Sequence, residues 1–244
     1  MMQETKQTEE IKIYEALIKY YECKEQQTED YRLAFDIFSK YCKNYYNSSN
    51  LSEMDEELFN KFFLYYLPKL KLTFSEKRLK SIFGHIYKIL ERVQLQHNID
   101  LTALYSSSYS NFADDTARII DLRKELLKNT NSPILSWDPL IIDFNYYKQN
   151  DKKRSWLPRK EIYEQGYFEM VDKLGNNYFL LKKIQSQSCY IKLKLNKATN
   201  SLLRNNDILH MRLKRRIFST VWEIIEVKGC YLSGIDQYIN KVHN

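Results

Sequence analysis

The first half of the chain repeats its apolar residues every three or four positions, the spacing that places them on one face of a helix. The pattern is clearest over residues 79–93. Four further segments have the same spacing: residues 13–20, 33–41, 58–66 and about 111–127. Five helices joined by polar loops predict a compact helical bundle.

Start and stop signals accompany three of these helices. Thr28 precedes the second segment, and residues 52–55 are a plausible cap for the third, which Pro68 is expected to end. Thr73 and Glu76 form a capping box ahead of residues 79–93, because the threonine oxygen and the glutamate satisfy free backbone donors.

After residue 160 the repeat changes to two residues, the side-chain period of a β-strand. Lys192 and Lys194 alternate with apolar residues, and His210, Arg212 and Lys214 do so further along the chain. The residues expected to point inward are Ile191, Leu193, Leu195, Leu209, Met211 and Leu213. Other strands are predicted over residues 167–171, 178–184 and 222–227, with a short helix over residues 199–203.

Five short strands in a segment of this size favour a closed barrel of the OB or SH3 kind, because closure hides the strand edges. Three of the four prolines fall between residues 130 and 160, and four of the five glycines follow them. We therefore predict an α+β protein with a helical bundle at residues 1–130 and an ordered connector at 131–165. A small, basic, β-barrel-like domain is predicted at residues 166–244.

The positive charge is confined to the second part of the chain. The whole sequence has a net charge of +7, but residues 1–150 contain 20 Lys and Arg against 22 Asp and Glu. Residues 151–244 contain 18 against 9. This asymmetry favours a polyanionic partner for the β domain, and the alternative is a charge that serves only solubility.

Basic side chains on neighbouring strands would merge into one surface that neutralises phosphates. The candidate nucleic-acid-binding residues are Lys192, Lys194, Arg212, Lys214, Arg215 and Arg216, with Lys152, Lys153 and Arg154 in the connector. Tyr178, Tyr190 and Trp222 are candidate stacking platforms for bases, although Trp222 also fits a core position. Residues 203–209 resemble the Gly-Asp strand entry of small nucleic-acid-binding and ligand-binding barrels, with Asn206 in place of the glycine.

Residues 31–95 resemble the core-binding domain of tyrosine recombinases, also called phage integrases. The resemblance rests on a helix with Phe35, Phe38 and Tyr41, then a capped segment with Phe59, Phe62 and Phe63, then an amphipathic helix with Phe83 and Tyr87. It implies a small helical module that clamps one side of a DNA duplex. The family's catalytic His-x-x-Arg spacing is absent at His210, where the next residues are Met211, Arg212 and Leu213.

The chain contains none of the usual catalytic or phosphate-loop motifs, and its four cysteines and four histidines lack metal-ligand spacing. We therefore expect no catalytic residue, no metal and no cofactor. The polar first residues do not resemble a secretory signal and no apolar run could span a bilayer, which predicts a cytoplasmic protein without a membrane partner.

The favoured hypothesis is a non-enzymatic nucleic-acid-binding protein, an accessory factor of a phage, plasmid or other mobile element. DNA is favoured over RNA, and RNA stays open. The alternative is a protein–protein interaction module, in which paired tyrosines at residues 45–46, 65–66 and 146–147 form the binding surface. A third interpretation, an enzyme with a polar cleft between the domains, also stays open.

Overall fold

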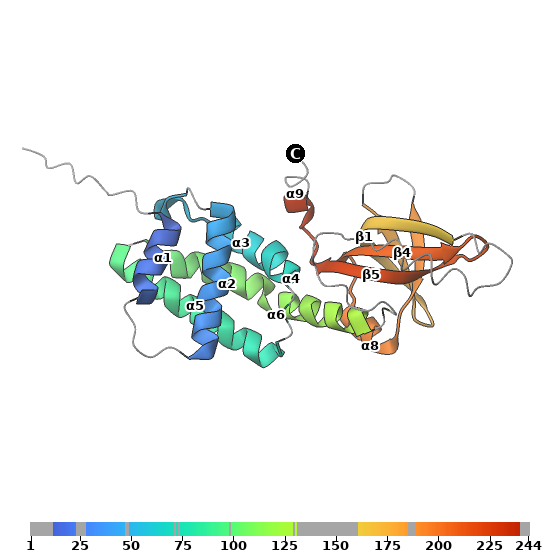
Figure 1. The fold of residues 1–244 in the computed structure, drawn as a ribbon, viewed down its shortest axis with the longest axis horizontal. Helices are drawn as coiled ribbons and strands as arrows, with labels where there is room; N and C mark the ends of the chain where they lie inside the picture. The colour runs from blue at the N-terminus through green and yellow to red at the C-terminus, as the bar shows by residue number, and fades with distance from the viewer. Residues whose placement is uncertain are drawn as a thin grey trace, which may run out of the picture. The chain divides into compact units, whose positions relative to one another are not determined.

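The computed structural model describes residues 12–22, 28–46, 49–70, 72, 74–97, 99–128, 130, 161–184 and 189–239. The chain forms two compact units, Met1–Arg118 with Gly234–Asn244, and Ile119–Ser233. We call them the helical unit and the β unit. Helices precede a five-stranded sheet along the chain, which confirms the α+β class (Figure 1). Most of the predicted connector, residues 131–160, lies outside the described residues.

The helical unit contains four of the five predicted helical segments and the first part of the fifth. Its elements are α1 (Ile13–Glu22), α2 (Glu29–Tyr46), η1 (Leu51–Glu53), α3 (Glu56–Lys61), η2 (Phe62–Tyr66), α4 (Leu67–Lys69), α5 (Glu76–His97), the first part of α6 (Leu101–Lys128) and α9 (Asp236–Ile239). α6 begins ten residues before its predicted start at 111, because Leu101 and Tyr105 extend its buried face through a serine-rich stretch. Among the described residues, no helix has both the length and the apolar composition to cross a membrane.

Side-chain caps start α2, α3 and α5, the three helices with predicted start signals. Thr28 Oγ1 accepts a hydrogen bond from the Tyr31 amide at 3.2 Å, and Asp55 Oδ1 accepts one from Leu58 at 2.9 Å. The α5 cap is Ser75, whose Oγ accepts from the Arg78 amide at 3.3 Å, two residues after the predicted cap. Thr73 itself lies outside the described residues.

The core of the helical unit is an aromatic cluster centred on Tyr41. The ring of Tyr41 lies 5.1 Å from that of Phe62 and 5.0 Å from that of Tyr66. Its hydroxyl donates to the Leu58 carbonyl oxygen at 2.6 Å, so the buried polar atom is satisfied. Burial raises the pKa of the Tyr41 hydroxyl far above its ordinary value. The phenol is therefore a neutral core residue.

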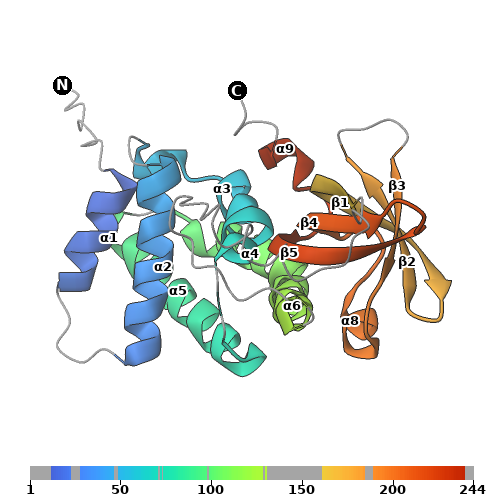
Figure 2. The same ribbon diagram turned by 45° about the vertical axis from the view of Figure 1, so that its right-hand side comes forward.

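The β unit is a five-stranded sheet with one short helix (Figure 2). Its elements are β1 (Glu161–Gly175), β2 (Tyr178–Lys183), β3 (Tyr190–Lys194), α8 (Lys197–Leu202), β4 (Ile208–Arg216) and β5 (Val221–Tyr231). The strand order is β1-β2-β3-β5-β4, and β4 pairs back with β1, so the sheet closes on itself. β3 and β5 are parallel, and the other pairs are antiparallel.

The alternation of apolar and polar residues correctly predicts the inner face of this sheet. Ile191, Leu193, Leu209, Met211 and Leu213 are each fully buried. Leu195, the sixth predicted member, is 6 % exposed. Because side chains alternate across a strand, the intervening basic residues must point outward.

The last turns of α6 also belong to the β unit. Leu122 and Leu126 are fully buried there. Arg123 Nη2 donates to the Lys228 carbonyl oxygen on β5 at 3.2 Å. The thiol of Cys230 is fully buried on the same strand, and burial raises its pKa to about 12. It is therefore an unreactive packing group.

Asn206 and Asp207 lead into β4, and Asn206 adopts the backbone conformation that a glycine would favour there. Asn206 has φ of 67°, the left-handed region where glycine is favoured and asparagine is tolerated. The buried Asp207 carboxylate accepts a hydrogen bond from the Arg204 amide at 2.7 Å. Backbone hydrogen bonds of 2.8 Å join both residues to Met170 on β1. Asparagine therefore takes the place of glycine at this turn.

Candidate nucleic-acid interface

The predicted basic residues of the sheet lie on two strands that are not adjacent. Lys192 and Lys194 are on β3, whereas Arg212 and Lys214 are on β4. The strand order places β5 between β3 and β4. β3 and β4 are therefore not the adjacent strands on which a merged basic surface was expected. Alternation determines which way a side chain points, but it carries no information about which strands pair.

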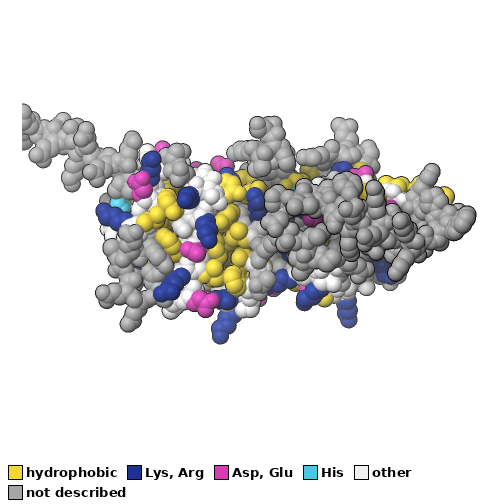
Figure 3. Space-filling model, in the orientation of Figure 1, with side chains coloured by type: hydrophobic (Ala, Val, Ile, Leu, Met, Phe, Trp, Pro, Cys, Tyr) yellow, Lys and Arg dark blue, Asp and Glu magenta, His cyan; other side chains and the backbone are white. Residues whose placement is uncertain are grey.

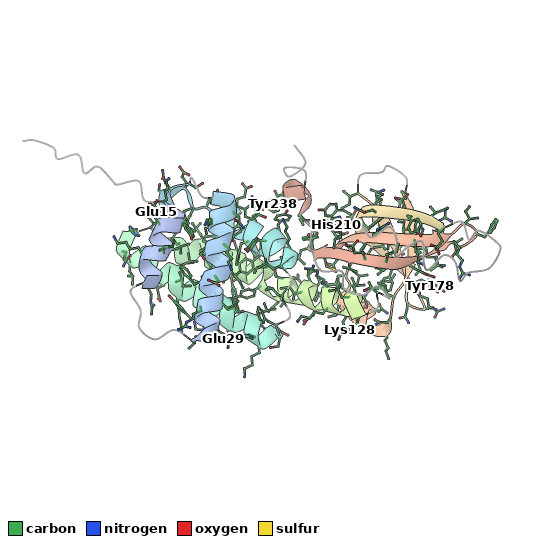
Figure 4. The ribbon with its side chains drawn as sticks, viewed as in Figure 1. Glu15, Glu29, Lys128, Tyr178, His210 and Tyr238 are labelled. Carbon is green, nitrogen blue, oxygen red and sulfur yellow. The ribbon has the colours of Figure 1, made fainter. Side chains whose placement is uncertain are left out.

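One set of outward side chains belongs to β2 and β3, and we call it the β2–β3 face. Its members are Tyr178, Leu180, Lys182, Tyr190, Lys192 and Lys194. They pair across the two strands as Tyr178 with Lys194, Leu180 with Lys192, and Lys182 with Tyr190. The face therefore alternates lysines with tyrosine and leucine, and Figure 4 labels Tyr178.

Tyr178 holds two of these lysines. The Nζ atoms of Lys192 and Lys194 lie 4.5 and 5.5 Å from the centre of its ring. The negative face of the ring attracts the ammonium groups, so their long side chains are partly ordered before a ligand arrives. Tyr190 differs because it is 55 % exposed. Of the two rings, Tyr190 presents the larger free surface.

The lysines of this face form no ion pair with any described acidic side chain. For the β2 members of the face, the nearest acids by strand register come from β1, where Glu169 pairs with Lys182 and Asp172 pairs with Leu180. On the other side, Val221 of β5 lies beside Lys192. Lys192 is flanked by Leu180 and Val221, and Lys194 lies beside Tyr178, whereas Glu223, two residues after Val221 on β5, is the acid nearest to Lys194 by register. Neither lysine forms an ion pair with a described acid, so both charges are available to a phosphate.

The basic residues of β4 have acidic neighbours instead, and we call this surface the β1–β4–β5 face. Three basic and three acidic side chains alternate across its strands: Arg212, Lys214, Arg216, Glu161, Glu223 and Glu226. Lys214 Nζ lies 3.5 Å from Glu161 Oε1. In the register Arg216 pairs with Glu161, and Arg212 with Glu226. The formal charges of the six groups cancel.

Arg215 serves the fold of the sheet. Its Nη1 donates to the carbonyl oxygens of Ile217 at 3.2 Å and Ser219 at 3.0 Å. Its guanidinium lies 5.0 Å from the centre of the Trp222 ring. Trp222 is only 8 % exposed, so it is a core residue and not a stacking platform. Lys152, Lys153 and Arg154 lie outside the described residues.

Two residues that sequence reasoning missed are Lys182 and Phe218. Lys182 lies in the predicted strand 178–184, and its spacing of two from Tyr178 and Leu180 is the signal that identifies it. Phe218 lies in the turn between β4 and β5 and is 99 % exposed. A single phenylalanine in a turn has no period, so its exposure follows only from the structure.

The paired tyrosines of the helical unit differ in exposure: Tyr45 and Tyr46 are partly exposed, whereas Tyr65 and Tyr66 are buried. Tyr65 and Tyr66 are 5 % and 6 % exposed, because they pack in the aromatic cluster around Tyr41 and Tyr45. Residues 146–147 lie outside the described residues. Acidic and basic side chains are interspersed on the view of the helical unit in Figure 3. This mixture agrees with the near-zero net charge of residues 1–150.

Within the described ranges, no three His, Cys, Asp or Glu side chains gather in an arrangement that could hold a metal ion. Comparisons with protein-family models, curated proteins and solved structures give no match to this chain. The resemblance of residues 31–95 to recombinase core-binding domains therefore stays a prediction.

Proposed function

We propose that this chain is a non-enzymatic nucleic-acid-binding protein whose contact surface is the β2–β3 face. The single observation that carries the proposal is the composition of that face. Its charged members, Lys182, Lys192 and Lys194, are all positive, and the two tyrosines of the face lie among them. Lysine contacts with phosphates release counterions and supply affinity for any sequence.

The topology of the sheet supports the same proposal. We assign the β unit to the OB type, in preference to the SH3 type. Five strands close in the order β1-β2-β3-β5-β4, with α8 between β3 and β4. OB domains are five-stranded Greek-key barrels that bind oligonucleotides on their second and third strands. The lysines and tyrosines of the β2–β3 face occupy those two strands.

The test compares two matched double variants of the full chain. Each variant changes two outward basic residues of one strand to glutamate, either Lys192→Glu with Lys194→Glu or Arg212→Glu with Lys214→Glu. The probe is a mixed-sequence oligonucleotide titrated at several salt concentrations. We expect the β3 variant to lose at least about tenfold in affinity and to flatten the salt dependence by roughly 0.7 per lost contact to a single strand.

The β4 variant is the control, and it should bind nearly as well as the parent. Both variants should fold, because surface changes usually alter stability by less than about 0.5 kcal/mol. Equal losses in the two variants, or a loss in the β4 variant alone, would contradict the assignment. A parent chain without any salt-dependent binding would contradict the function itself and favour a protein partner.

The helical unit is proposed as a scaffold or weak clamp in an accessory factor of a mobile element. This proposal rests on the near-zero net charge of residues 1–150 and on the resemblance of residues 31–95 to core-binding domains. We propose that the protein acts in the cytoplasm. A charge change on α5, such as Lys77→Glu with Lys88→Glu, tests the clamp with the same probe. A loss as large as that of the β3 variant would transfer the main contact to the helices.

A further inference from the structure

The turn between β4 and β5 holds a phenylalanine almost wholly in water. Phe218 is 99 % exposed, and its neighbour Ile217 is 39 % exposed. Isolated apolar side chains on a surface are common and mean little alone. A side chain held outward by an ordered turn differs from one exposed on a loose turn, and the hydrogen bonds of this turn decide between the two.

Hydrogen bonds fix the backbone on both sides of Phe218. The carbonyl oxygens of Ile217 and Ser219 both accept from Arg215 Nη1, at 3.2 and 3.0 Å. Ser219 Oγ donates to the Val221 carbonyl oxygen at 2.9 Å and accepts from the Val221 amide at 3.1 Å. The Ser219 amide donates to the Arg216 carbonyl oxygen at 2.9 Å. The turn is therefore preorganised, which lowers the entropy that a ligand loses on binding.

Strand direction places this turn at one end of the β2–β3 face. β3 and β5 are parallel, and Val221 lies beside Lys192. Residues that precede Val221 therefore lie toward the end of β3 that begins with Tyr190. Phe218 and Tyr190 are accordingly two exposed rings at the same end of β3. The Tyr178 ring is already occupied by two ammonium groups.

We propose that Phe218 and Tyr190 stack on unpaired bases, so that the β unit prefers single strands to duplexes; this rests on the proposed function. In a duplex both faces of each base are covered by their neighbours, so the protruding ring finds no free partner. An unpaired base exposes its flat face, and aromatic stacking on it tolerates any base. Tyr178 positions Lys192 and Lys194 on the phosphates, and the two exposed rings contact the bases.

The test uses Phe218→Ala in the full chain with three probes of equal length. These are a mixed-sequence single strand, its duplex, and an abasic strand that keeps the sugar–phosphate backbone but has no bases. We expect the parent to bind the single strand most tightly. Phe218→Ala should lose roughly five- to hundredfold for that strand, the range of one stacked base, and keep its affinity for the abasic strand. Leu95→Ala, which removes an 80 % exposed side chain from the helical unit, is the matched control.

The outcomes separate this inference from the function on which it rests. If Phe218→Ala binds all probes as the parent does, or weakens all three equally, stacking is overturned while the phosphate contacts of β3 stand. If the parent binds no strand, both proposals fail together.

A spectroscopic signature gives a second readout. Phe218→Trp should retain binding, because indole also stacks on bases. Its added fluorescence should fall when the base-containing strand binds and stay unchanged with the abasic strand. An emission change that is equal for both strands would contradict stacking.

Discussion

Two faces of the same sheet carry pairs of outward basic residues at identical spacing, and their surroundings differ. Lys192 and Lys194 on β3 lie beside Tyr178, Leu180 and Val221. Arg212 and Lys214 on β4 lie beside glutamates, and one of them forms an ion pair. The number of basic residues therefore does not identify a phosphate-binding surface. The charge on the paired strands does, because acidic neighbours cancel the field that attracts a polyanion.

The largest expected effect is on the stability of the β unit, whose buried interior lies beneath both faces. Leu193→Glu places a carboxylate at a fully buried position without a partner. We expect a loss on the order of 5 kcal/mol in the free energy of unfolding, comparable to the stability of a whole domain. Thermal unfolding followed by circular dichroism measures it.

The neighbouring substitution Lys194→Glu is the control, because this side chain is exposed. It should unfold at nearly the parent temperature. If the two variants unfold alike, the inward and outward assignment of β3 is incorrect, and with it the composition of the β2–β3 face.

The next largest effect should come from removing the acids of the β1–β4–β5 face. Changing Glu161, Glu223 and Glu226 to glutamine releases the three basic groups from their neighbours. We expect affinity for a single strand at low salt to rise about three- to tenfold and the salt dependence to steepen. Unchanged affinity would show that acidic neighbours are not what separates the two faces.

The smallest effect should follow from Tyr178→Leu, which removes the ring that holds Lys192 and Lys194. Each exposed cation–π contact is worth about 0.5–1 kcal/mol, so we expect affinity to fall about two- to fivefold. The salt dependence should stay the same, because both charges remain. A loss as large as that of Phe218→Ala, with the abasic strand unaffected, would make Tyr178 a stacking platform instead.

Much of this architecture follows from residue spacing, because burial repeats along a helix or strand. The five helical segments and the inward parity of β3 and β4 were predictable for that reason. The pairing of β3 with β5 was not, because it depends on contacts between residues distant in sequence. The separation of the two basic faces and the neighbours of Lys214 depend on that pairing.

The spacing of apolar residues likewise does not predict which side chains of a turn are exposed. Phe218 resembles any other apolar residue in the sequence, and only the hydrogen bonds of Arg215 and Ser219 identify a turn that holds it outward. The early start of α6 was hidden by serines, which favour turns by composition but here lie on a helix anchored by Leu101 and Tyr105.

The measurement that tests the central claim most directly is chemical footprinting of lysines in the unmodified full chain. Acetylation is followed residue by residue by mass spectrometry, with and without a saturating mixed-sequence single strand. We expect Lys182, Lys192 and Lys194 to be protected by the strand, while Lys214 on β4 and the exposed Lys197 on α8 react as before. Protection of Lys214 with continued reaction of Lys192 and Lys194 would contradict the assignment of the interface to the β2–β3 face.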